Sequence, residues 1–218
     1  MDLVYWVSES GKYGAPVVVL MALAVLVSRQ EIDSSRRTKE FIIVALTASA
    51  LAGGGALANE YFIKTGLQVP RPNIVWLAGE NGSGPLGMTA EAFYSVGNSE
   101  ARSASLAEVL QQDSNPVLLT STIEAHWIDE TGFSFPSGHS FSAMFIATFL
   151  LMIGASCLTT KRFWLLYLLL PWALAVCYSR PVLGVHTPTD VLIGGMQGIV
   201  VGILAWKISL QLMGRISE

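Results

Sequence analysis

The sequence predicts an all-α fold, a polytopic membrane helical bundle of about five to six transmembrane helices with a long extracytoplasmic loop region. Two observations support this class. Of the 218 residues, 52% are hydrophobic and only 13% are charged, which is too apolar for an ordinary soluble domain. Several apolar runs also approach the roughly 20 residues that a helix needs to cross a bilayer. We therefore expect one membrane domain over residues 1–218, and the net charge of -3 argues against nucleic acid as a partner.

The N-terminal half contains two expected spans. The first covers residues 13–27. It could extend upstream through residues 3–7, but Glu9 and Lys12 interrupt that longer run. The loop at residues 29–40 carries four basic residues, and short basic loops stay in the cytoplasm. The second span covers residues 41–63, and the three consecutive glycines in its middle predict close helix packing. The polar segment that follows, residues 64–135, is the expected extracytoplasmic insertion.

The C-terminal half contains three further expected spans. They cover residues 136–158, 163–178 and 188–206. The basic pair Lys161 and Arg162 places the loop between the first two of them in the cytoplasm. Gly194, Gly198 and Gly202 recur every fourth residue, so they share one helix face and predict packing against a neighbouring helix.

This alternation places three polar stretches on the outer face of the membrane. They are residues 64–72, 136–139 and 179–190, and each abuts the end of an expected membrane helix. Charged groups beside the hydrocarbon layer are costly, so they indicate a functional site by default. The three stretches therefore predict one site at the outer end of the bundle.

The first stretch carries two cations, Lys64 and Arg71, immediately after the second span. Taken alone, such a pair would usually anchor the helix end to lipid headgroups. The positive-inside rule disfavours cations on the outer face, however, so their presence there asks for an anionic partner. Prolines on both sides of Arg71 stiffen its backbone, which suits a fixed hydrogen-bond donor.

The second stretch, Pro136-Ser137-Gly138-His139, precedes an apolar run and is typical of a helix start. Backbone N–H groups at a helix N-terminus bind anions, and a glycine lets the ligand approach the backbone closely. Ser137 adds a hydroxyl donor. His139 stands where it could protonate a leaving-group oxygen, although a lone histidine at a helix start is as often structural.

The third stretch combines Arg180, His186 and Asp190. The guanidinium of Arg180 is a planar fork of donors that matches phosphate oxygens. Pro188 predicts a helix start with Thr187 as the N-cap, which places Asp190 in the first turn. From there its carboxylate can reach back to His186, four residues earlier, and hold the imidazole in one tautomer and orientation.

Together the stretches supply the components of phosphoryl transfer. Cationic donors and helix dipoles stabilise developing negative charge, one histidine can act as a nucleophile, and the other can act as an acid and base. The sequence shows no carboxylate cluster that suggests a metal site. Cys157 and Cys177 should lie toward opposite membrane faces, where they form neither a disulfide nor a zinc site. We therefore expect chemistry without a metal or any other cofactor.

The order and spacing of these residues resemble the three-part signature of the type 2 phosphatidic acid phosphatase superfamily. The pattern is Lys-x6-Arg-Pro, then Pro-Ser-Gly-His, then Ser-Arg-x5-His-x3-Asp. The positions that match are Lys64, Arg71, Pro72, Pro136, Ser137, Gly138, His139, Ser179, Arg180, His186 and Asp190. Within the superfamily, residues 126–139 look most like the bacterial phosphatidylglycerophosphatase B and undecaprenyl-diphosphate phosphatase group. Members often have three helices before the first motif, whereas this sequence shows two expected spans there.

The resemblance implies a role for each matching residue. His186 would attack phosphorus and form a phosphohistidine, with Asp190 orienting it, while His139 would protonate the leaving oxygen and then activate water. The phosphate oxygens would be held by Lys64, Arg71, Ser137, Gly138 and Arg180. Outside the motifs, Glu130 is a candidate modulator of substrate choice or proton transfer, and His126 is expected to be structural or solvated.

The expected protein is thus a multi-pass lipid phosphatase of the bacterial inner membrane, with its site facing the periplasm. Its substrate would be phosphatidylglycerophosphate, undecaprenyl diphosphate or both. Two alternatives stay open. The same residues could serve a lipid A phosphatase, or a lipid transporter or binding protein that keeps the phosphate pocket without catalysis. The hydropathy excludes the soluble vanadium haloperoxidases, which share the signature, and the sequence carries no signal of oligomeric state.

Overall fold

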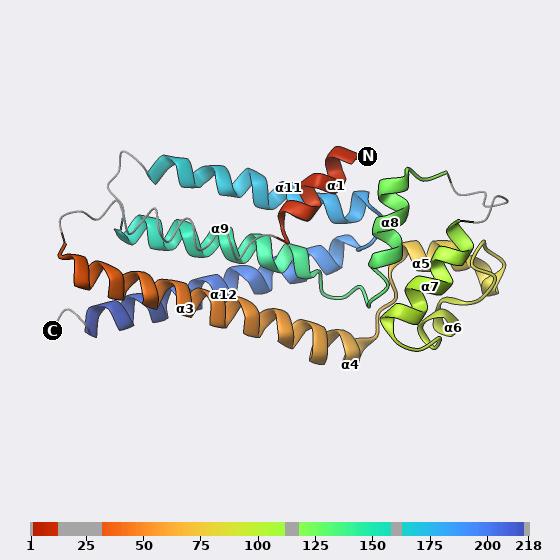
Figure 1. Ribbon diagram of the computed structural model, residues 1–218, viewed down its shortest axis with the longest axis horizontal. Coiled ribbons are helices and arrows are strands. Elements are labelled where there is room, and N and C mark those ends of the chain that lie inside the picture. The colour runs from red at the N-terminus through yellow and green to blue at the C-terminus, as the bar shows by residue number, and fades with distance from the viewer. Residues whose placement is uncertain (1, 13–31, 112–117, 158–162, 216–218) are drawn as a thin grey trace.

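The computed structural model describes residues 2–12, 32–111, 118–157 and 163–215. The regular elements within these ranges are all helices, which confirms the predicted all-α class. Figure 1 shows a bundle of long helices lying side by side, with a lobe of short helices at one end. The expected span over residues 13–27 lies outside the described residues.

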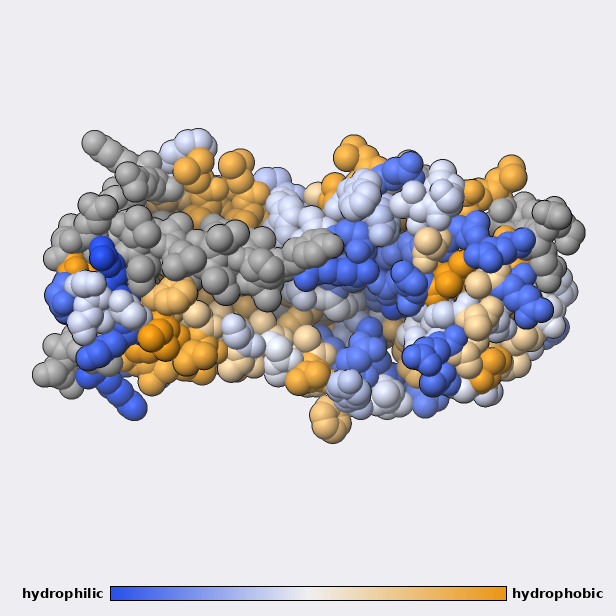
Figure 2. Space-filling model, viewed as in Figure 1, coloured by the Kyte–Doolittle hydropathy of each residue, from blue (hydrophilic) through white to orange (hydrophobic). Residues whose placement is uncertain are grey.

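Among the described residues, four helical segments are long and apolar enough to cross a membrane, as a multi-pass membrane protein requires. Their bounds are Ser34–Ala78, Gly138–Cys157, Trp164–Val182 and Pro188–Arg215. They correspond to the expected spans that begin at residues 41, 136, 163 and 188. Figure 2 shows hydrophobic side chains gathered over the bundle and hydrophilic ones at its far end and where the lobe begins, the pattern expected when lipid surrounds the bundle.

The first segment is a composite of several helical elements. It comprises α3 (Ser34–Ala58), the π-helical turn η1 (Asn59–Lys64), the short α4 (Thr65–Leu67) and α5 (Pro72–Ala78). A π-helical turn inside a longer helix is uncommon and is frequently found at functional sites. Here it ends at Lys64, the first residue of the predicted site.

The other long helices are α9 (Gly138–Cys157), α11 (Leu169–Val182) and α12 (Pro188–Arg215), with the 3-10 turn η3 (Trp164–Leu168) before α11. The helix start expected near residue 136 is confirmed. The expected end at Tyr178 was too early, because α11 continues to Val182 and the N–H of Leu183 donates to the carbonyl of Ser179 at 2.9 Å. Arg180 therefore lies in the last helical turn and not in a loop.

Helices α9 and α12 pack together through the glycine face of α12. A Cβ at Gly194 would lie 2.3 Å from the carbonyl oxygen of Ser137, and one at Gly198 would lie 2.3 Å from that of Phe141. This confirms the packing predicted from the glycine spacing, because a residue with a Cβ would force the helices apart. The contact also brings the second and third predicted stretches together, since the N–H of Ser137 donates to the carbonyl of Asp190 at 3.0 Å.

Helix α3 approaches α9 at one of its three consecutive glycines. A Cβ at Gly55 would lie 2.4 Å from the ring of Phe141. At Gly53 and Gly54 a Cβ would meet no atom of the described residues within 4 Å. Of the three consecutive glycines, only Gly55 therefore packs closely against the described residues.

The lobe consists of α5, the 3-10 turn η2 (Glu80–Gly82), α6 (Ala90–Tyr94), α7 (Ser99–Leu110) and α8 (Ser121–Asp129). It has its own hydrophobic core, which includes Leu77, Phe93 and Leu106. Leu183 and Val185 are buried in the same core, and the indole N–H of Trp127 donates to the carbonyl of Leu183 at 2.8 Å. The lobe thereby holds the loop between α11 and α12 in place.

A short N-terminal helix, α1 (Asp2–Ser10), lies against α11 and α8 where the bundle meets the lobe (Figure 1). The indole N–H of Trp172 in α11 donates to the hydroxyl of Ser10 at 3.0 Å. Cys157 and Cys177 form no disulfide with each other.

Candidate active site

The predicted site residues meet at the junction of bundle and lobe, around a cavity of about 340 Å³. Residues that line it include Lys64, Arg71, Glu130, Gly138, His139 and His186. Behind this wall lie Asp190, Ser137 and Arg180. The structure thus brings all nine predicted residues into one region, although they come from segments as far apart as residues 64 and 190.

His186 follows the core residue Val185, and its imidazole is almost fully buried. Its Nε2 lies 3.4 Å from Nη1 of Arg71, while its Nδ1 lies 3.3 Å from the hydroxyl of Ser134 and 3.6 Å from Oδ2 of Asp190. Burial lowers the pKa of His186 to about 3; the hydrogen bond to Asp190 opposes this, and the nearby charge of Arg71 adds to it. The imidazole is therefore neutral at pH 7, and Nε2 is the nitrogen that faces the cations.

Asp190 sits in the first turn of α12 and is held by a reciprocal helix cap. The N–H of Thr187 donates to Oδ2 of Asp190 at 2.7 Å, and the N–H of Asp190 donates to the hydroxyl of Thr187 at 3.2 Å. This confirms the predicted helix start with Thr187 as N-cap. The same Oδ2 accepts a hydrogen bond from the hydroxyl of Ser134, so Ser134 and Asp190 together face Nδ1 of His186.

Ser134 was missed by the sequence reasoning. It is fully buried, and its N–H donates to the carbonyl of Val69 at 2.8 Å, which ties the loop before α9 to the segment that carries Arg71. Its position two residues before the Pro-Ser-Gly-His stretch was the one available signal. A serine there carries no distinctive pattern, because its partners lie 52 and 56 residues away.

Arg71 is 2% exposed and uses its whole guanidinium. Its Nε donates to the carbonyl of Gly132 at 2.9 Å, its Nη1 donates to the carbonyl of Val185 at 3.3 Å, and its Nη2 lies 2.7 Å from Oε2 of Glu130. These contacts leave the side chain in one orientation. Two of them anchor it to the loops on either side of the cavity, and the third is a tight ion pair.

Arg180 is 0% exposed and approaches Glu130 from the opposite side. Its Nη2 lies 3.4 Å from Oε1 of Glu130. Its Nη1 donates to the hydroxyl of Ser8 in α1 at 2.6 Å and lies 3.4 Å from Nε2 of His126. His126 is buried, as its expected structural role requires, and is not solvated.

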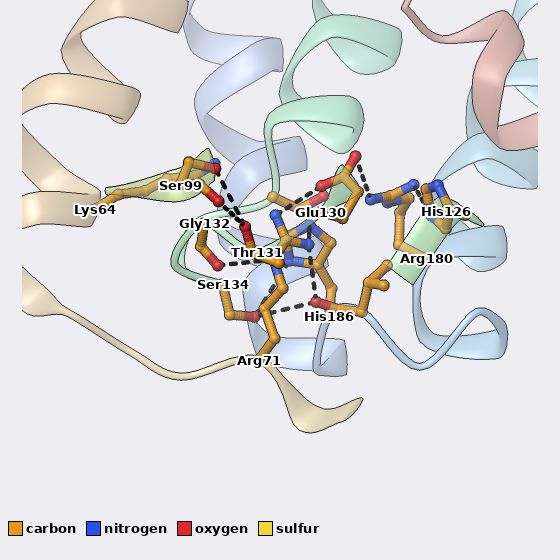
Figure 3. Close-up of polar contacts among 12 residues, drawn as sticks. Lys64, Arg71, Ser99, His126, Glu130, Thr131, Gly132, Ser134, Arg180 and His186 are labelled. Carbon is orange, nitrogen blue, oxygen red and sulfur yellow. Dashed lines mark hydrogen bonds and ion pairs between the residues drawn. The ribbon is translucent and has the colours of Figure 1, made fainter. Parts of the chain in front are cut away.

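Glu130 lies between the two arginines, as Figure 3 shows. Burial alone would raise the pKa of Glu130, but the charges of Arg71 and Arg180 outweigh it and hold this pKa well below its usual range. The side chain is therefore a carboxylate. Two guanidinium groups facing one oxyanion form an arrangement that also suits phosphate oxygens.

His139 and Gly138 form the first turn of α9 at the cavity wall. Nε2 of His139 is buried and makes no hydrogen bond to the described residues. A Cβ at Gly138 would meet no atom of the described residues within 4 Å, so the helix start is open toward the cavity. This is the geometry expected of a helix N-terminus that receives an anion.

The two remaining predicted residues are engaged within the protein. Nζ of Lys64 lies 2.8 Å from Oε2 of Glu60, one turn earlier, while its side chain still lines the cavity. Ser137 is fully buried, and its hydroxyl accepts a hydrogen bond from the hydroxyl of Ser140 at 3.0 Å. Its own hydroxyl hydrogen can still be donated.

Two further cavities continue from the site along α3 and α9. One of about 210 Å³ shares Lys64 and His139 with the cavity described above. It adjoins a second one of about 260 Å³, with which it shares Ala56 and Ser142. The second is lined mainly by small and apolar side chains. The three adjoining cavities thus lead from the charged site to an apolar space within the bundle.

Comparison with known proteins identifies the family. Residues 40–213 match the model of the PAP2 superfamily. Phosphatidylglycerophosphatase B of Escherichia coli K12 is 30% identical over 167 residues, which are 76% of this chain and 60% of that protein. The Haemophilus influenzae protein of the same name is 33% identical over 173 residues, 77% of this chain and 60% of that protein.

Two other similarities are more limited. Lipid A 4'-phosphatase of Bacteroides thetaiotaomicron is 36% identical over 87 residues, which are 40% of this chain and 36% of that protein. The crystal structure of a transmembrane PAP2 type phosphatidylglycerolphosphate phosphatase from Bacillus subtilis aligns with a TM-score of 0.34 and 19% identity, covering 91% of this chain and 97% of that one. The chain spans about 60% of the length of the phosphatidylglycerophosphatase B relatives. The match over residues 40–213 shows that this chain belongs to the PAP2 superfamily.

Proposed function

We propose that the protein is an integral membrane lipid phosphatase that acts on phosphatidylglycerophosphate, undecaprenyl diphosphate or both, through a phosphohistidine and without a metal. One observation carries the proposal. A buried, neutral imidazole, that of His186, turns Nε2 toward Arg71 at a cavity that also holds His139. A neutral imidazole nitrogen held beside a fixed cation is what attack on phosphorus needs.

In the proposed reaction, Nε2 of His186 forms a bond to phosphorus while the bond from phosphorus to the lipid oxygen breaks. His139 gives its proton to that oxygen, and the lipid alcohol or lipid monophosphate departs. His139 then takes a proton from water, whose oxygen attacks phosphorus, so that phosphate leaves and His186 is regenerated. Asp190 stabilises the positive charge on the imidazole through its Nδ1 side, with Ser134 as a second hydrogen-bond partner.

The phosphate oxygens would be held by the cations and the open helix start. These are Lys64, Arg71, Arg180, Ser137 and the backbone of Gly138. Because Glu130 now pairs with both arginines, phosphate must compete with this carboxylate for them. In this way Glu130 would modulate the site: it favours substrates whose phosphate binds strongly enough to displace it.

The cavities along α3 and α9 support a lipid substrate. Their apolar end can take an acyl or isoprenoid chain while the phosphate reaches the charged end. We propose that residues 64–135, which form most of the lobe, are an insertion on the periplasmic side of the inner membrane. The site then lies at the level of the outer headgroups, where lipid phosphates are found.

A second candidate function is lipid A dephosphorylation. The 36% identity to a lipid A 4'-phosphatase over 87 residues supports it, and the same catalytic residues would serve. Lipid transport or binding without catalysis would need the phosphate pocket but not His186 or His139. The retention of both histidines at the cavity favours an enzyme.

The test is phosphate release by the purified protein in detergent with EDTA present. Phosphatidylglycerophosphate, undecaprenyl diphosphate, phosphatidic acid and lipid A are compared as substrates, with His186→Ala as the control. We expect release from the first two to persist in EDTA, and His186→Ala to lower kcat by about a thousandfold or more. Full activity of His186→Ala would refute the mechanism. Release from lipid A alone would establish the second candidate, and no release from any lipid would indicate binding or transport.

A further inference from the structure

The N-terminal helix α1 contacts the candidate site, although it lies outside the part of the chain that matches the superfamily. The hydroxyl of Ser8 accepts a hydrogen bond from Nη1 of Arg180 at 2.6 Å, and both side chains are 0% exposed. Just after the helix, a Cβ at Gly11 would lie 3.7 Å from the ring of His139. The N-terminal segment therefore contacts Arg180 through Ser8 and passes close to His139 at Gly11.

The contacts of Arg180 divide its guanidinium into two halves. Nη1 is held by Ser8 and also lies 3.4 Å from Nε2 of His126. Burial and the charge of Arg180 lower the pKa of His126 to about 4, so its imidazole is neutral and Nε2 can accept the hydrogen bond. The other half, Nε and Nη2, makes no hydrogen bond to the described residues beyond the 3.4 Å ion pair with Glu130.

This edge lies beside Glu130, which lines the cavity, so a phosphate that displaces the carboxylate can use it. Two parallel N–H donors on one edge of a guanidinium match two phosphate oxygens, but only when the plane of the group is fixed. Arg180 lies just before Pro181 in the last turn of α11. Because an arginine side chain has many rotamers, this backbone position does not by itself set the plane of the guanidinium. Within the described residues, Ser8 and His126 are the groups that hold the opposite edge.

We propose that Ser8 of α1 is a positioning residue that fixes the guanidinium of Arg180 so that its Nε and Nη2 face the phosphate. This inference rests on the proposed function of Arg180 as a phosphate ligand. It extends the active site to a helix that precedes the matched region by about 30 residues of chain.

The experiment compares Ser8→Ala with Ser10→Ala in the full-length protein. Ser10 lies on the same helix, and its hydroxyl accepts from Trp172 of α11, so the control removes a similar hydrogen bond away from Arg180. We expect Ser8→Ala to lower kcat/KM about tenfold, because it removes a hydrogen bond to a charged group, and Ser10→Ala to change it less than twofold. Equal effects of the two substitutions would refute the proposal.

A double-mutant cycle separates positioning from general destabilisation. Lysine has no Nη1 to be held, so Ser8→Ala should have little further effect on kcat/KM in an Arg180→Lys background. The same loss in both backgrounds would show that Ser8 acts independently of Arg180 and overturn the inference. If Ser8→Ala does not fold, Ser8→Cys, which keeps the volume and weakens the acceptor, takes its place in both arms.

A binding measurement keeps this test separate from the test of catalysis. Inorganic phosphate should raise the thermal unfolding temperature of the wild type and of Ser10→Ala more than that of Ser8→Ala. A protein that shows this pattern but releases no phosphate from lipid would refute the proposed enzyme and leave the role of Ser8 standing. Identical phosphate-induced shifts in all three proteins would refute the role of Ser8.

Discussion

The arginine side chains of the candidate site are more deeply buried than cations usually are. Arg180 is 0% exposed and Arg71 is 2% exposed. A buried charge is costly unless another charge compensates it, and Glu130 provides that compensation for both in the free protein. The carboxylate thus occupies the position between the cations that we assign to phosphate, which links the stability of the site to its affinity for substrate.

Replacement of Glu130 by glutamine should separate these two effects. Glu130→Gln removes the competing negative charge, so we expect KM for the lipid and the inhibition constant for inorganic phosphate to fall about three- to tenfold. The two arginines then lack a counter-charge, so the thermal unfolding temperature without phosphate should fall as well. Both are measured on purified protein in detergent.

Asp129→Asn is the matched control for Glu130→Gln. Asp129 also lines the cavity, but the structure shows no ion pair between it and either arginine. Its replacement should change phosphate inhibition less than twofold. Equal changes from the two substitutions would mean that overall negative charge, and not the contact with the arginines, governs binding.

At the scale of elements, the close packing of α9 and α12 sets how far apart the histidines at the starts of these two helices lie. The glycine face of α12 lets the N–H of Ser137 reach the carbonyl of Asp190 at 3.0 Å. Each of the two helices carries one of the proposed catalytic histidines, His139 or His186, at or just before its start. The distance between the proposed acid and the proposed nucleophile therefore depends on how closely these helices approach.

A methyl group at Gly194 should disturb this arrangement. Its Cβ would lie 2.3 Å from the carbonyl oxygen of Ser137, a backbone atom that cannot move alone. We expect Gly194→Ala to destabilise the protein by about 1–3 kcal/mol and to lower kcat about tenfold or more, because small displacements of reacting groups are costly.

The neighbouring glycine provides the control for Gly194→Ala. A Cβ at Gly195 would lie 3.4 Å from the flexible side chain of Met144, so Gly195→Ala should be tolerated. Thermal unfolding and phosphate release from a soluble phosphate ester report stability and chemistry separately. A fully active Gly194→Ala would show that the spacing of these helices is not critical for catalysis.

At the scale of the molecule, the lobe and the bundle have different structural roles. The lobe core holds the loop before α12 and thereby His186, the proposed nucleophile, while the bundle contains the cavities that extend from the site. The bundle also exposes large apolar side chains, including Leu46, Leu174 and Leu192, as a surface in contact with lipid requires. A substrate that is half lipid and half phosphate fits this division.

Filling the apolar end of the cavities should block lipids selectively. Ala52 of α3 lines the cavity of about 260 Å³ at the apolar end, so Ala52→Phe should lower kcat/KM for lipid substrates about tenfold or more. Hydrolysis of a soluble ester such as p-nitrophenyl phosphate should stay within about twofold of the wild type, because the charged end is unchanged. Ala50→Phe, on the exposed face of α3, is the control. Equal losses on both substrates would argue against a lipid path through these cavities.

Features that depend on neighbouring residues in the chain were predictable from the sequence. Hydropathy indicated the helical membrane fold, because a bilayer requires long apolar runs whatever their partners. The helix starts at Gly138 and Pro188 followed from proline, glycine and capping residues, whose effects act within one turn. The spacing of Gly194 and Gly198 likewise indicated a packing face.

The tertiary structure decided which side chains meet. No local pattern shows that Ser134 bonds to Asp190, that Ser8 holds Arg180 across 172 residues, or that Glu130 lies between two arginines. Such contacts depend on how helices distant in sequence pack, and a one-residue rotation of any helix would remove them. The sequence by itself determined the membrane helices and the residues available for chemistry, whereas the packing of those helices determined their orientation and partners.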